Sequence, residues 1–347
     1  MRISIVNVQA PFVQGGAEYL ADSLAQKLQE RGHEVACVRI PFKWYPPQAI
    51  LEHMLACRLL HIESGNPDLV IALKFPAYLL PFPNKKIWLL HQFRQAYELW
   101  GTPHQAIPNT PEGRRIREMI WQADNLYLRE AKAIYTNSRI VARRLQQYNG
   151  IGVQGVLYPP LLRPEIYHCA GFGDYFFYPS RMNTLKRQAL AIEAMRFVRS
   201  GFRLVLAGRA DQESHLDELR NLVRRHKLED RVTLLGWISE QKKADLMARC
   251  YAALYIPYDE DSYGYVTLEA FHSSKPVLTL SDSGGTDEVI EHGGNGLILE
   301  PTAEALAAGM EELWSSRQRT QEMGQAAQAT LERYQIRWDH ILERLVA

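Results

Sequence analysis

Short apolar runs alternate with amphipathic stretches at the start of the chain. Residues 3–8 (ISIVNV) and 34–40 (EVACVRI) are apolar enough to predict two strands. Between them, leucines recur every four residues from Leu20 to Leu28, which predicts one apolar face of a helix. Gly32 follows that stretch, where a left-handed C-terminal cap is favoured. The chain therefore begins with a strand, a helix and a second strand.

The same alternation continues and then restarts after a break rich in proline and glycine at residues 157–175. Nearly continuous apolar runs are typical of strands buried on both faces of a parallel sheet. They cover residues 68–73, 86–91 and 131–138 before the break, and 175–180, 202–208, 231–236, 252–257 and 275–281 after it. Amphipathic stretches predict helices at residues 139–148, 186–198, 214–226, 239–250 and 265–273.

Two runs of alternating strands and helices predict two α/β domains, each with a mostly parallel sheet. A chain of 347 residues is long enough for both. We expect a Rossmann-like N-terminal domain at residues 1–163 and a second at 164–330, followed by a helix at 331–347. Ligands of such sheets bind at the carboxyl ends of the strands, so two facing domains would form a shared cleft.

The composition narrows the class of protein. Apolar residues make up 46% and charged residues 23%, with a net charge of +1, which weighs against a nucleic-acid partner. The four cysteines are scattered singly, without zinc-ligand spacing, as in a reduced cytosolic protein. Residues 1–11 are too short for a signal peptide, and no apolar run reaches membrane-span length. We therefore expect a cytoplasmic protein that can still contact the inner face of a membrane.

Glycines and cations follow several predicted strands. Gly15 and Gly16 follow the first strand and could admit a ligand closely, although a glycine pair alone also fits a plain turn. His91 follows the fourth strand, and such a histidine is often only a packed surface group. Arg181 and Lys186 flank a loop that enters a helix, and this arrangement favours a diphosphate.

Residues 258–270 (YDEDSYGYVTLEA) allow two interpretations. The carboxylates of residues 259–261 could clamp a divalent cation on a nucleoside diphosphate. Alternatively, Asp261 and Glu269, eight residues apart, could hold different parts of one ligand without metal. Gly264 precedes a predicted helix whose first amides would face the ligand, and Glu269 could accept hydrogen bonds from a ribose diol.

In this order, the stretches resemble the retaining glycosyltransferases of family 4, which have the GT-B fold. The resemblance implies that the helix at residues 331–347 returns to the first domain. The resemblance covers most of the C-terminal half and parts of the N-terminal half. Matching stretches are GGAEYLADSLAQKLQERGHEV, LLH, TNS, SRMNTLK, LAGRA, LLGWIS and LYIPYDEDSYGYVTLEAFHSSKPVLTLSDSGGTDEVIEHGGNGLIL.

The resemblance implies a role for each matching residue. Gly15 and Gly16 match the glycine loop beside the donor phosphate and the acceptor, and His91 matches the histidine that reaches the donor sugar. Arg181 and Lys186 match the basic pair on the diphosphate.

The resemblance also assigns the acidic motif, with one departure. Glu269 matches the second glutamate of the family's E-x7-E motif, which holds the ribose hydroxyls. Asp261 stands where the first glutamate is expected, and the adjacent Glu260 could serve instead. The implied catalytic residues are His91, Asp261, Arg181 and Lys186. The other implied donor-binding residues are Trp237, Tyr263, Gly264, Tyr265 and Val266.

The resemblance implies a retaining hexosyltransferase. It would move a sugar from a nucleotide-diphosphate sugar to a hydroxyl of a saccharide or lipid-linked saccharide, as in polysaccharide, glycolipid or cell-envelope glycan synthesis. We expect no cofactor and no metal, a UDP-sugar in preference to a GDP-sugar, and same-face substitution at the anomeric carbon.

Other functions remain open at this point. The same fold serves nucleotide-sugar epimerases, phosphorylases and proteins that bind without catalysis. A dinucleotide oxidoreductase is disfavoured because the glycine fingerprint is missing. Peripheral membrane contact is a hypothesis based on Arg139, Arg143, Arg144 and residues 42–47 (FKWYPP), although a solvated charged face explains them equally well.

Overall fold

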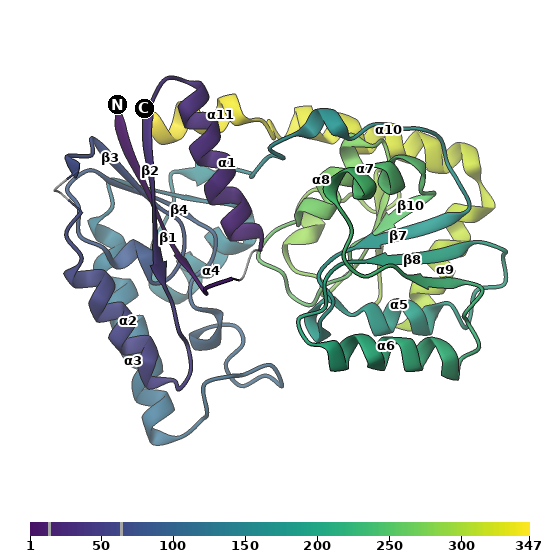
Figure 1. The fold of residues 1–347 in the computed structure, drawn as a ribbon, viewed down its shortest axis with the longest axis horizontal. Helices are drawn as coiled ribbons and strands as arrows, with labels where there is room; N and C mark the ends of the chain where they lie inside the picture. Colours follow the sequence, from purple (N-terminus) through teal and green to yellow (C-terminus); the bar gives the residue numbers. More distant parts are fainter. Residues whose placement is uncertain (13–14, 63–64) are drawn as a thin grey trace. The chain divides into compact units, whose positions relative to one another are not determined.

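The computed structural model describes residues 1–12, 15–62 and 65–347, and the chain divides into two compact units (Figure 1). Unit 1 comprises Met1–Pro159 and Arg337–Ala347, and unit 2 comprises Pro160–Ile336. The observed boundaries lie close to residues 163 and 330, which the sequence analysis chose. None of the helices in these residues is both long and apolar enough to cross a membrane.

Unit 1 is built on a six-stranded parallel sheet in the order β2-β1-β3-β4-β5-β6. The strands are β1 (Arg2–Gln9), β2 (Glu34–Pro41), β3 (Leu69–Ala72), β4 (Lys85–Leu89), β5 (Ala133–Thr136) and β6 (Gly155–Val156). The strand order reverses beside β1, because β2 lies on one side of it and β3 on the other. Loops that leave β1 and β3 therefore diverge at a topological switch point, where ligands of open α/β sheets bind.

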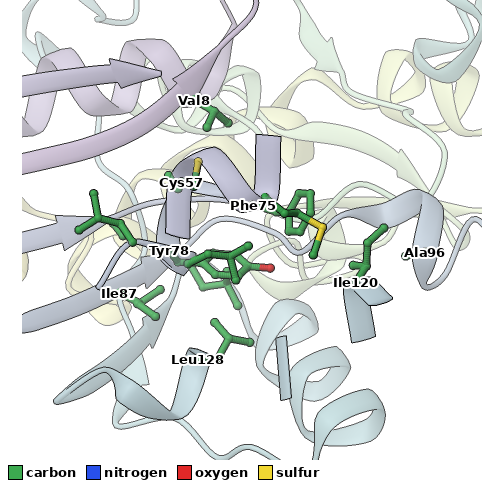
Figure 2. Packing of buried hydrophobic residues seen from close by; sticks show 14 of the residues in the cluster. Val8, Cys57, Phe75, Tyr78, Ile87, Ala96, Ile120 and Leu128 are labelled. Atoms are coloured by element: carbon green, nitrogen blue, oxygen red, sulfur yellow. The ribbon is translucent and has the colours of Figure 1, made fainter. Parts of the chain in front are cut away.

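Helices cover both faces of this sheet. They are α1 (Gly16–Glu30), α2 (Gln48–Leu59), α3 (Pro111–Tyr127), α4 (Arg139–Asn149) and α11 (Trp338–Val346), with the 3₁₀ turns η2 (Ala77–Leu79), η3 (Arg94–Ala96) and η4 (Leu128–Glu130). One core cluster joins the sheet to α2, α3 and α4; Figure 2 labels Val8, Cys57, Phe75, Tyr78, Ile87, Ala96, Ile120 and Leu128 among its members.

The C-terminal helix α11 belongs to unit 1, as the sequence analysis predicted. Its buried residues Trp338, Ile341, Leu342 and Leu345 join a second core cluster with the leucines of α1. The rings of Trp88 and Trp338 meet edge to face, with centroids 6.4 Å apart. Burying four large side chains stabilises this return by several kcal/mol, at about 1.5–3 kcal/mol for each.

Unit 2 has a second six-stranded parallel sheet in the order β12-β11-β10-β7-β8-β9. The strands are β7 (Tyr175–Pro179), β8 (Arg203–Ala207), β9 (Val232–Leu234), β10 (Ala252–Leu254), β11 (Val277–Leu280) and β12 (Gly296–Leu299). The switch point lies between β7 and β10, since β8 and β9 extend one way and β11 and β12 the other.

The helices of unit 2 include the four that the sequence analysis predicted between residues 186 and 273. They are α5 (Gln188–Ala194), α6 (Glu213–Arg225), α7 (Glu240–Arg249), α8 (Tyr265–His272), α9 (Ala303–Ser315) and α10 (Arg317–Arg333), with the 3₁₀ turns η5 (Pro164–Ile166), η6 (Thr184–Lys186) and η7 (Gly285–Glu288). The Ser239 hydroxyl accepts a hydrogen bond from the Lys242 amide, 3.2 Å away, and so caps α7.

Candidate active site

Three loops meet at the switch point of unit 2, and backbone hydrogen bonds join them. They follow β7, β10 and β11. The Tyr258 amide donates to the Leu185 carbonyl at 2.8 Å, which joins the first two loops. The Asp259 amide donates to the Asp282 carbonyl at 2.9 Å, which joins the second to the third. The side chains that these loops carry are therefore held near one another.

Lys186 lies at this junction, at the end of η6. The Asn183 side chain accepts from the Lys186 amide at 3.0 Å and fixes the turn. The Lys186 ammonium forms an ion pair with Glu260 and donates to the Tyr255 hydroxyl at 3.0 Å. Burial raises the pKa of Tyr255, so its phenol stays protonated and can donate to Glu260. A cation from the β7 loop thus contacts two side chains that follow β10.

Two arginines extend the positive charge of the β7 loop. Arg181 is half exposed, and its guanidinium lies 3.5 Å from the Asp211 carboxylate. Arg187 donates two hydrogen bonds to Asp282, at 2.7 and 2.6 Å, and lies over the ring of Tyr258. Arg181 was predicted from the sequence as a diphosphate ligand, whereas Arg187 was not assigned any role.

Gly264 has a structural reason to be glycine. It has φ +72°, a left-handed conformation that favours glycine. A Cβ atom there would lie 2.2 Å from the Tyr255 ring. Gly264 therefore lets Tyr255 pack beneath the start of α8, whose first amides have no partner within the helix. Tyr265 and Val266 begin that helix, as predicted.

Glu269 lies on the second turn of α8 and is 4% exposed. One carboxylate oxygen pairs with the Lys243 ammonium of α7. The other oxygen, Oε2, is buried and has no hydrogen-bond partner among the residues that the structure describes. An unsatisfied buried carboxylate oxygen costs stability unless a ligand satisfies it. This atom is able to accept a hydrogen bond from a ligand hydroxyl.

Asp261 and Tyr263 are both buried in the β10 loop. The Tyr263 carbonyl accepts from the Thr267 hydroxyl at 2.6 Å, which ties the loop to α8. Gly284 and Gly285 of the third loop pack against the backbone of Glu260 and Ser262 so closely that a Cβ atom at either glycine would collide with it. The β10 loop is therefore enclosed by its neighbours.

Trp237 follows β9 at the end of the sheet and is 74% exposed. The Gly208 amide donates to the Gly236 carbonyl at 2.7 Å, so β8 and β9 remain paired up to this point. Strand β9 lies two strand spacings, about 10 Å, from β7. Trp237 thus lies along the same sheet edge as Lys186 but not beside it.

The predicted residues of unit 1 lie at its own switch point and near it. The Gly15 amide donates to Glu18 at 2.9 Å, and the other oxygen of Glu18 accepts from the Lys74 ammonium at 2.9 Å. Gly16 begins α1. The Gly15 amide, in the loop that could admit a ligand closely, is therefore bonded within the protein in this structure. Glu18 and Lys74 were not singled out from the sequence.

His91 follows β4 and is partly buried, with Nδ1 2.7 Å from the Gln92 carbonyl oxygen. The Gln92 side chain is anchored in the core, because its amide donates to Asp124 at 3.0 Å and to Asn149 at 2.9 Å. Tyr78 also donates to Asp124, at 2.8 Å, and burial raises the pKa of Asp124 to about 6. This buried network fixes the backbone next to His91.

Unit 2 is similar in sequence to known glycosyltransferases. Residues 173–330 match the family model described as glycosyl transferases group 1. The human alpha-1,3/1,6-mannosyltransferase ALG2 is 32% identical over 135 residues. That match covers 35% of this chain and 32% of the human protein's length. Unit 2 therefore has the sequence pattern of a glycosyltransferase.

Solved structures extend the likeness to the whole chain. The Anabaena protein Alr3699/HepE, in complex with UDP and glucose, has a TM-score of 0.72 at 20% identity and covers 100% of this chain and 99% of its own. Sucrose-phosphate synthase from Thermosynechococcus elongatus has a TM-score of 0.80 at 16% identity, covering 99% of this chain and 96% of its own. The fold is GT-B.

The predicted GT-B fold class is thereby confirmed, and the assignment of individual residues stays a prediction. The structure brings Arg181, Lys186, Asp261 and Glu269 to neighbouring loops and helices of one unit. Among the residues that it describes, no group of three or more histidine, cysteine, aspartate or glutamate side chains is arranged to hold a metal.

Proposed function

We propose that this GT-B protein transfers a hexose from a nucleotide-diphosphate sugar to a hydroxyl of a saccharide or lipid-linked saccharide, with retention and without a metal. The observation that carries the proposal is the buried, unpartnered Glu269 Oε2 in the same unit as Lys186 and Arg181. A nucleotide sugar offers both complements, since its ribose has hydroxyls and its diphosphate has negative charge.

In this proposal, the chain's residues act mainly on the leaving group. Cleavage of the glycosyl–phosphate bond gathers negative charge on the diphosphate. Lys186, Arg181 and the first amides of α8 would stabilise that charge where it develops. Asp261 would hold hydroxyls of the transferred sugar. The leaving phosphate would assist deprotonation of the acceptor hydroxyl.

The choice of donor nucleotide is based on the names of similar proteins. UDP is the nucleotide in the Alr3699/HepE structure, whereas the human relative is named as a mannosyltransferase. We propose a UDP-sugar as donor, with a GDP-sugar as the alternative.

A thermal-shift panel of UDP, GDP and ADP tests the donor site and the metal together. We expect UDP at about a hundred times its Kd to raise the Tm by about 5 °C, with or without EDTA. ADP is the control for nonspecific diphosphate binding. An equal shift by all three would contradict base recognition, no shift by any would contradict the donor site, and a shift that EDTA abolishes would contradict metal independence.

Membrane contact is a separate part of the proposal, and the exposed aromatic side chains of one loop support it. Arg144 of α4 is largely buried and pairs with Glu98, which makes the arginine group a weaker candidate. Trp44 and Tyr45 are 44% and 63% exposed, and Lys43 lies over the Tyr45 ring. Aromatic and basic side chains together favour an interface with anionic lipid.

Vesicle flotation tests this loop. We expect the protein to float with vesicles containing phosphatidylserine, and expect the double substitution of Trp44 and Tyr45 by serine to reduce the bound fraction severalfold. Phe197→Ser removes an aromatic residue of similar exposure, 41%, from unit 2 and serves as the control. Equal flotation of all three proteins, or none by the wild type, would rule out this contact.

A further inference from the structure

Four cations of unit 2 lie in or near the loops at its switch point, and each has a carboxylate partner in the ligand-free protein. The pairs are Arg181–Asp211, Lys186–Glu260, Arg187–Asp282 and Lys243–Glu269. A nucleoside diphosphate would bring at least two further negative charges to this balanced edge. Its binding is favoured only if a carboxylate leaves its cation, because like charges at close range repel.

The four pairs differ in how firmly they are held. Arg187 and Asp282 form two short hydrogen bonds, and the guanidinium also lies over Tyr258. The Glu269 side chain is buried on α8. Arg181 and Asp211 are half exposed and 3.5 Å apart, so solvent already weakens their attraction. Lys186 and Glu260 remain as a close pair whose lysine side chain is only 13% exposed.

Glu260 has a fixed backbone and a side chain that reaches solvent. Its amide donates to the Ser283 carbonyl at 3.0 Å, and its carbonyl accepts from the Gly285 amide at 2.8 Å. The side chain is 26% exposed. Rotation about the side-chain bonds can therefore take the carboxylate away from Lys186 while the β10 loop stays in place.

We infer that Glu260 is an internal competitor for the donor diphosphate: its carboxylate occupies Lys186 in the free protein and must leave when a nucleoside diphosphate binds. This inference rests on the proposed function. Glu260 thus limits donor affinity, and the Tyr255 hydroxyl keeps the ammonium in place during the exchange. The residue adjacent to Asp261 thereby has a role different from that of the family's first glutamate.

Isothermal titration of wild type and Glu260→Gln with UDP and with uridine tests the inference, with GDP and guanosine as the second pair. We expect Glu260→Gln to tighten nucleoside-diphosphate binding about three- to tenfold and to leave nucleoside binding unchanged. Glutamine keeps the size of the side chain and removes its charge. Glu193→Gln is the control, because its carboxylate is similarly exposed at 30% and also pairs with a cation, Arg196.

The outcomes separate this inference from the proposed function. If wild type binds neither UDP nor GDP, the donor site itself is wrong. If wild type binds one of them and Glu260→Gln binds it equally or more weakly, Glu260 is not a competitor. Equal tightening of nucleoside and diphosphate would also overturn the inference, since the effect would then not involve the phosphates.

Discussion

Replacing Lys186 by alanine is expected to lower kcat/KM about 100- to 1,000-fold, the usual effect of removing one group that stabilises developing charge. The ammonium stands at the switch point of unit 2, held by the Tyr255 hydroxyl and Glu260. Its removal would take away the cation for which Glu260 and the donor diphosphate are proposed to compete. The measurement is initial-rate kinetics of nucleotide release from the donor sugar, with the free energy of unfolding determined in parallel by urea denaturation.

Lys242→Ala is the matched control for this substitution. Lys242 is an exposed lysine of α7, and its loss should change neither the rate nor the stability by a measurable amount. Wild-type turnover by Lys186→Ala would remove Lys186 from the proposed mechanism. Loss of activity together with several kcal/mol of stability would instead indicate that Lys186 supports the fold.

The sheet edge at which Lys186 and Gly264 lie was predictable, because hydrophobic patterning shows where the strands end. Lys186 and Gly264 follow two separate apolar runs, and parallel strands place such loops at one sheet edge. The return of the last helix was expected from the family resemblance, and in the structure its apolar residues pack in the core cluster of unit 1 that contains the leucines of α1.

The pairing of charges at that edge could not be predicted from the sequence. Tyr255 stands directly after the short strand β10, within an apolar run, and its hydroxyl contact depends on a loop that is 69 residues away in sequence. Arg187 has φ +54°, which is uncommon for a residue with a side chain, and its sequence gives no sign of this. Contacts between distant loops are set by tertiary packing rather than by local pattern.

Some missed elements did carry local signals. Helix α3 was not predicted, although Thr110 caps it and Pro111 opens it, a typical pair of start signals. Gly113 lowers the helix propensity of this stretch. Glycine is required there because a Cβ atom would lie 1.8 Å from the Pro108 carbonyl oxygen. Strand β6 is only two residues long, too short for its pattern to be distinguished from a loop.

Glu269→Gln is expected to weaken UDP binding about 10- to 100-fold, because hydrogen bonds to a charged group contribute about 1.5–3 kcal/mol each. The glutamine oxygen can still accept from Lys243, while the unpartnered atom, Oε2, is replaced by an amide nitrogen and the negative charge is lost. The fold should survive, since a buried charge with one unsatisfied oxygen is removed rather than created. Isothermal titration with UDP gives the Kd, and circular dichroism confirms the fold.

Deoxyribose nucleotides show whether the lost contact is the proposed one. Wild type should bind 2′-deoxy-UDP or 3′-deoxy-UDP more weakly than UDP, whereas Glu269→Gln should bind all three with similar affinity. Glu218→Gln, at a carboxylate of α6 with a side chain that is 73% exposed, should behave as wild type. If Glu269→Gln still distinguished UDP from both deoxy forms, the ribose hydroxyls would be held elsewhere. The orphaned oxygen would then need another ligand, and the strongest argument for a nucleotide donor on this unit would be lost.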